Sequence, residues 1–101
     1  MFPGLTTKLS ETDNVALATT ISPKSDLIIV TDTTSTTVLT TITPAFGGGF
    51  SGIHVIVNRS GNNITTLTTG NILTAVTIGV NVAVILVYSK LDDKFFVGAL
   101  A

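Results

Sequence analysis

From residue 15 onward, short runs of apolar and β-branched residues alternate with polar turn segments. The runs recur about every 8 to 12 residues, a spacing typical of all-β sandwiches and barrels. No helix-length segment has apolar residues at helical spacing, so we expect almost no helix, although 15–21 also suits a short one. The predicted strands cover residues 15–21, 27–31, 37–43, 53–57, 64–68, 75–78, 82–88 and 95–97.

Two of these runs predict how their strands face the core. In the run 37–43, alternation places Val38 and Ile42 on one face. The run 82–88 is apolar at every position, whereas a strand with one solvated face alternates apolar and polar residues. We therefore expect 82–88 to be a central strand covered on both sides, with a subunit interface as the second cover.

The composition supports a β fold and excludes several classes of protein. Thr, Val and Ile, which fit a pleated sheet, make up 40 of the 101 residues. Hydrophobic residues make up 45% of the chain and charged residues 11%, the reverse of an intrinsically disordered composition. Without cysteine there is no disulfide scaffold, and without a basic patch we expect no nucleic-acid partner.

The few charges are unevenly placed. Arg59 is the only charged residue between Asp32 and Lys90. Because a small soluble monomer normally carries charge over its whole surface, the middle of the chain is expected to be covered by other protein. The alternative is a monomer whose surface is made of neutral Thr, Ser and Asn.

The chain divides into two predicted parts. Residues 1–14 are polar and contain Pro3 and Gly4, which predicts an extended N-terminal arm. Residues 15–101 are predicted to form a small antiparallel β-sandwich or jelly-roll-like domain that oligomerises. No membrane helix is expected, because the most apolar run, 72–88, is short and interrupted by Asn81 and other polar groups.

The residues that often carry catalysis have no supporting motif. His54 alternates with Ile53 and Val55, so it points away from their face, and no G-x-S-x-G nucleophile elbow accompanies it. We interpret it as a partly exposed or interface histidine. Asp92 and Asp93 form the only adjacent carboxylate pair, in a predicted charged turn where both face water.

Ligand-binding motifs are equally weak, and we expect no cofactor. Asp26 and Asp32 could hold Ca²⁺ together with loop carbonyl groups. Three glycines, 47–49, suggest a phosphate-binding loop, but no lysine follows them as a P-loop requires. The favoured interpretation is a sharp turn or close backbone approach, with Phe46 and Phe50 inserted into a core or a neighbouring subunit.

The order of motifs from residue 26 to residue 97 resembles a module common in virion proteins of tailed bacteriophages. The chain departs from that pattern by ending in Lys94-Phe95-Phe96-Val97 where Lys-Trp-Tyr is frequent. The motifs are the Thr-, Val- and Ile-rich stretch from Asp26 to Thr43, the glycine-rich loop 47–52, the apolar strand 53–57, Gly70-Asn71-Ile72, the apolar strand ending in Tyr88, and the Lys94-Phe95-Phe96 hairpin.

The resemblance implies a structural role rather than an enzymatic one. Such modules occur in head fibres, tail fibres and capsid decoration proteins, and often assemble as trimers. Because only about 25 residues precede the module, we expect a decoration (cement) protein rather than a long fibre. Its partners would be two further copies and the major capsid protein, at the capsid surface of the virion. The residues expected at the interfaces are Phe2, Leu5, Phe46, Phe50, Phe95 and Phe96.

Two alternatives remain open at this point. A head- or tail-fibre tip that binds a host-surface receptor would present the polar loops 33–36 and 58–63. A cell-wall hydrolase would depend on His54 and Asp92.

Overall fold

The computed structural model describes residues 12–45 and 51–98, and all the secondary-structure elements within these ranges are β-strands. The predicted all-β class is therefore confirmed. The strands are β1 (Thr12–Ala16), β2 (Thr20–Ile21), β3 (Leu27–Asp32), β4 (Val38–Leu39), β5 (Thr41–Ile42), β6 (Gly52–Asn58), β7 (Ile64–Thr66), β8 (Thr77–Ile78), β9 (Ala83–Ser89) and β10 (Lys94–Val97).

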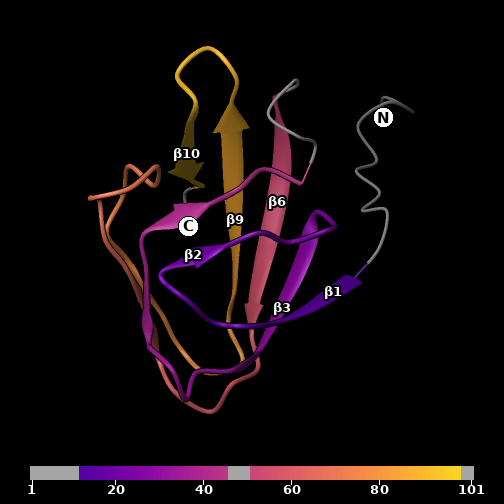
Figure 1. Ribbon diagram of the computed structural model, residues 1–101, viewed down its shortest axis with the longest axis vertical. Helices are drawn as coiled ribbons and strands as arrows, with labels where there is room; N and C mark the ends of the chain where they lie inside the picture. The colour runs from indigo at the N-terminus through magenta and orange to yellow at the C-terminus, as the bar shows by residue number, and fades with distance from the viewer. Residues whose placement is uncertain (1–11, 46–50, 99–101) are drawn as a thin grey trace.

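The longest strands form one five-stranded sheet, in the order β1-β3-β6-β9-β10 (Figure 1). Pairing is parallel from β1 to β3 and from β3 to β6, and antiparallel from β6 through β9 to β10. The central position expected for the apolar run 82–88 is confirmed, because β9 lies between β6 and β10.

The short strands form two smaller sheets, β2-β5 and β4-β7-β8, of which the pairs β2–β5 and β4–β7 are parallel. The expectation of a purely antiparallel sheet is therefore wrong. Alternation of apolar residues reports which side of a strand faces the core, but it carries no information on the direction of the neighbouring strand.

Two predicted strands are each divided between sheets. The run 37–43 splits at Thr40, so that β4 pairs with β7 while β5 pairs with β2. The break also shifts the alternation: Leu39, not Val38, is fully buried together with Ile42. The run 15–21 similarly divides into the end of β1 and β2, and β1 begins inside the segment predicted to be an arm.

The hydrophobic core lies between the inner face of the five-stranded sheet and the short strands, of which β2 crosses that face in Figure 1. The sheet contributes alternate residues, as expected from the two-residue period of a strand. The fully or almost fully buried apolar residues are Leu17, Ile21, Ile28, Val30, Leu39, Ile42, Ile56, Ile64, Ile72, Ile78, Val84, Leu86, Tyr88 and Phe95.

The segment Gly70-Asn71-Ile72 fastens β10 to β5. The side-chain amide of Asn71 donates to the Ile42 carbonyl at 2.7 Å and accepts from the Ile42 amide at 2.9 Å. The Asn71 carbonyl accepts from the Phe95 amide at 2.7 Å, and Ile72 forms a parallel bridge with Phe95. This motif, singled out by its resemblance to virion modules, therefore has a structural role that joins two sheets.

Candidate functional site

The two faces of β9 differ sharply in exposure. Val84, Leu86 and Tyr88 point into the core and are at most 2% exposed. Ile85 and Val87, on the opposite face, are 47% and 40% exposed. We expected this strand to be covered on both sides. The residues that the structure describes cover only the side that faces the core. The apolar second face is the most unusual surface of the molecule.

Cross-strand pairing extends this exposed surface over four strands. Antiparallel pairing places Ile53 opposite Val87, and Val87 opposite Phe96. Parallel pairing places β3 beside β6 in the same rows, so apolar side chains meet at each step across the sheet. We call these nine residues the outer apolar face. Its rows are Ile53, Val87 and Phe96; Leu27, Val55 and Ile85; and Ile29, Val57 and Ala83.

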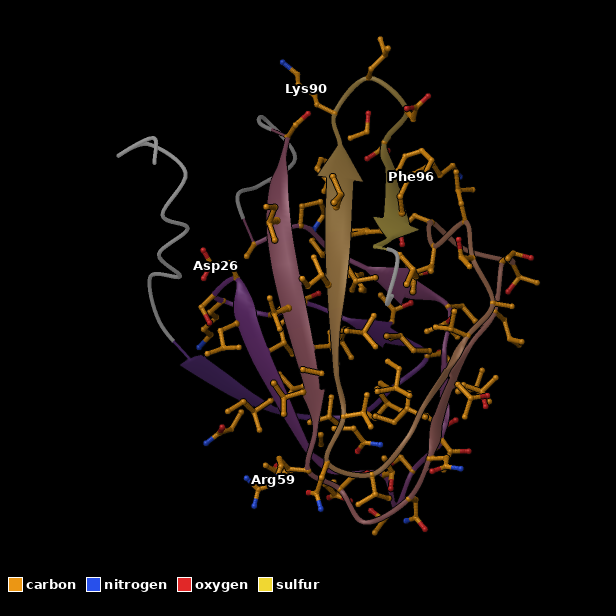
Figure 2. All side chains as sticks on the ribbon, turned by 180° about the vertical axis from the view of Figure 1, so that it is seen from behind. Asp26, Arg59, Lys90 and Phe96 are labelled. Atoms are coloured by element: carbon orange, nitrogen blue, oxygen red, sulfur yellow. The ribbon has the colours of Figure 1, made fainter. Side chains whose placement is uncertain are left out.

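The outer apolar face contains no charged residue, and polar or charged residues border it. Figure 2 shows the sheet from this side, with Asp26, Arg59 and Lys90 at the strand ends and Phe96 on β10. Asn14 is exposed on the neighbouring strand β1, and Lys94 precedes Phe96 on the same side of β10. An apolar centre with a polar rim is the usual anatomy of a protein interface.

The size of this face follows from sheet geometry. Nine positions, each about 4.8 Å wide across the sheet and about 6.8 Å long along a strand, give a surface of about 300 Å². Patches of this size on monomers are often functional. Leu73, 44% exposed, follows the Ile72–Phe95 bridge and adds a further apolar residue beyond the β10 edge.

The structure places the predicted interface residues differently from one another. Phe96 lies on the outer apolar face and is 38% exposed. Phe95 points the opposite way, is fully buried, and packs against the rings of Tyr88 and His54, so it belongs to the core of the chain itself. Phe2, Leu5, Phe46 and Phe50 lie outside the described residues.

Most of this face could not be predicted from the sequence, although two of its strands carry a recognisable apolar pattern. Strand β9 was recognised as apolar on both sides, and Ile53 and Val55 as sharing a face. What could not be seen was that β3, β6, β9 and β10 lie next to one another, because their pairing joins residues far apart in the chain.

His54 is fully buried, and the interpretation of a partly exposed or interface histidine is therefore wrong. Its Nε2 accepts a hydrogen bond from the Ala45 amide at 3.0 Å, and its ring meets Phe95 edge-on with centroids 5.1 Å apart. Burial lowers the pKa of the imidazole, while the nearby Asp26 carboxylate acts in the opposite direction. A neutral histidine that accepts this bond holds Ala45 beside β6.

The carboxylates Asp92 and Asp93 are used separately in the β9–β10 turn. Asp92 accepts a hydrogen bond from the Ser89 hydroxyl at 3.0 Å, and Asp93 accepts one from the Tyr88 hydroxyl at 2.5 Å. The bond to Asp93, together with burial, raises the pKa of Tyr88. Asp93 has a φ of 54°, in the left-handed region that tight turns require. The pair therefore shapes the turn.

The two polar loops of the fibre-tip alternative lie together. The Asn62 side chain donates to the Thr33 hydroxyl at 3.0 Å, which joins loop 58–63 to loop 33–36. Asn58, which is fully buried, donates to the carbonyls of Asn62 and Ile78 and accepts from Ser60. The buried amide of Asn58 therefore organises the loop, while its other residues remain at the surface.

Other binding chemistry has little geometric basis in the part of the chain that the structure describes. Asp26 and Asp32 flank opposite ends of β3, roughly 20 Å apart at strand spacing, so they cannot share a calcium ion. Among residues 12–45 and 51–98, no three potential metal ligands cluster, no pocket is present, and no helix is long and apolar enough to cross a membrane.

Comparison with known proteins adds no relative. The chain matches no protein-family model, no curated protein and no solved structure.

Proposed function

We propose that the protein is a structural component of a bacteriophage virion that decorates and cements the capsid as a trimer. The observation that carries this proposal is the outer apolar face, with Ile85 and Val87 40% or more exposed. An exposed face of this kind serves binding rather than solubility. In this proposal the protein acts by burying surface, at the outside of the shell and against the major capsid protein.

The energy available to such a protein is large enough for the role. Burying about 300 Å² of apolar surface at about 25 cal/mol per Å² contributes roughly 7 kcal/mol per copy, before the cost of ordering the partners. Repeated over a shell, contacts of this size between copies of the protein would tie neighbouring positions together at seams that would otherwise open first.

The finer architecture in this proposal is a β-sandwich or jelly-roll-like domain preceded by an extended arm. It is supported by a core that lies between the five-stranded sheet and the shorter strands. The arm would carry Phe2 and Leu5 to the shell, while the domain contacts its own copies.

Imaging of the native particle tests the proposal. A map of the virion should show the protein in many copies distributed over the shell, grouped around local symmetry axes. Shells assembled without it should bind the purified protein and resist heating better afterwards. A handful of copies at a single vertex or at the tail, or no binding to such shells, would contradict a cementing role.

A fibre tip that binds a host-surface receptor is the second candidate. The hydrogen bond between Asn62 and Thr33 favours it, because it unites two polar loops into one surface. Alanine replacements at the exposed Thr34 and Ser35 should then reduce adsorption to host cells without changing the melting temperature. Normal adsorption of such a variant virus would remove this candidate.

A further inference from the structure

We propose that the outer apolar face is the contact surface for a second copy of this chain. The inference rests on the proposed function for the presence of an oligomer and adds which surface forms it. The sequence alone predicts a subunit interface over the strand 82–88 and assigns contacts to five phenylalanines and Leu5, of which Phe96 alone lies on this face among the described residues.

The chemistry of the face limits its occupant. All nine side chains are aliphatic apart from Phe96, and none offers a hydrogen-bond donor or acceptor. The occupant must therefore be apolar and nearly flat at the spacing of a β-sheet. An identical sheet face meets both requirements, since two apolar sheet faces pack about 10 Å apart with their side chains interdigitated.

The area of the face also fits a second copy. A stable interface buries about 800 Å² per partner, with an apolar core and a polar rim. The outer apolar face supplies a little more than a third of that area as the core. Asn14, Ser89 and Lys94, which lie around it on β1, β9 and β10, would supply the rim.

Charge presents no obstacle to self-association. The chain has a net charge of -1, so two copies repel only weakly. Asp26, Arg59 and Lys90 lie at the strand ends in Figure 2, outside the nine residues of the face, so no charge on the face must be desolvated.

A pair of lysine substitutions tests the assignment. Val87 and Val80 are both 40% exposed, but Val87 lies on the outer apolar face and Val80 lies in the turn between β8 and β9. In sedimentation experiments on the full chain, Val87→Lys should weaken association at least tenfold, because it places a charge in an apolar contact. Val80→Lys should associate like the wild type, and circular dichroism of both variants should match the wild type.

Cross-linking keeps the test decisive if Val87→Lys fails to fold. Because the chain contains no cysteine, a single Ile85→Cys substitution places one thiol at the centre of the face. A bismaleimide reagent with a reach of about 10 Å should then join two chains, since that is the distance between packed sheets. The matched variant Val80→Cys should stay uncoupled under the same conditions.

Two results would overturn the inference. One is a wild-type chain that stays monomeric, and the other is an oligomer that is not weakened by Val87→Lys and not cross-linked through Ile85→Cys. A monomer whose Ile85→Cys thiol is protected from maleimide would identify another occupant, such as residues 1–11 of the same chain. Failure of the proposed function gives a different result. An oligomer that is held by this face but does not bind capsid shells would refute cementing and leave the inference intact. A monomer that binds capsid shells would refute the inference and leave cementing intact.

Discussion

His54 sits on the inner side of β6, where a charged imidazole would be costly. Burial is the main reason why its pKa is lowered in the folded chain, against an ordinary value of about 6.5 in the unfolded chain. As the pH falls below that value, the unfolded chain binds the proton first. The folded state is therefore fully stabilised above about pH 6.5 and loses stability as the pH falls toward the folded pKa.

Thermal unfolding between pH 7.5 and pH 5 should show this loss directly. His54 is the only histidine, and carboxyl groups with pKa values near 4 change little in this range. The melting temperature should fall with acidification in the wild type and stay nearly level in His54→Gln, whatever that variant's own stability. An equal slope in both proteins would show that His54 is not the titrating group.

Gly70 has no room for a side chain. An added Cβ would lie 2.1 Å from the Thr41 hydroxyl and 2.2 Å from the Thr40 carbonyl oxygen. Because one of these atoms is backbone, the strand itself must move, and Gly70→Ala should destabilise the fold by about 1–3 kcal/mol. At Gly79 the nearest atom would be 3.4 Å away, so Gly79→Ala is the control and should cost clearly less in urea unfolding.

At the scale of elements, Asn71 replaces a strand partner. Its side chain pairs with both the amide and the carbonyl of Ile42 and so continues the hydrogen bonding of β5. Asn71→Ala leaves both groups without that partner and should destabilise the fold by about 2 kcal/mol, at roughly 1 kcal/mol per hydrogen bond. Chemical denaturation measures this, with the exposed Asn63→Ala as a control. Equal stability of the two variants would contradict the fastening role.

The elements themselves were largely predictable, and their pairing was not. The strands expected at 27–31, 53–57 and 82–88 match β3, β6 and β9 to within one or two residues, because long β-branched runs are local signals. The split at Thr40 was missed because β4 and β5 serve different sheets, which no local pattern records. The parallel direction of β3 and β6 was missed for the same reason.

At the candidate site the same limit applies residue by residue. Alternation showed that His54 points away from Ile53, but the depth of its burial depends on Phe95, which lies 41 positions later in the chain. The exposed side of β9 was identified as a surface that needs a cover. Its extension to Leu27 and Phe96 became visible only through cross-strand register.

At the scale of the whole molecule, charge and apolar surface are separated. Among the described residues, Asp26, Asp32, Arg59 and Lys90 lie at strand ends and Asp92 and Asp93 lie in the β9–β10 turn, while the outer apolar face carries no charge. A small domain that places nine apolar residues together on one side is built to be covered there. This arrangement explains why the middle of the chain can be so poor in charge, and it is the physical basis for the proposed self-association.

Sedimentation equilibrium of the purified wild-type chain at micromolar concentration tests the central claim most directly. Buried by its own copies, the outer apolar face predicts a particle heavier than the single 10.4 kDa chain, and the proposed trimer predicts three times that mass. A single species of 10.4 kDa that stays unchanged as the concentration rises through the micromolar range would contradict the claim.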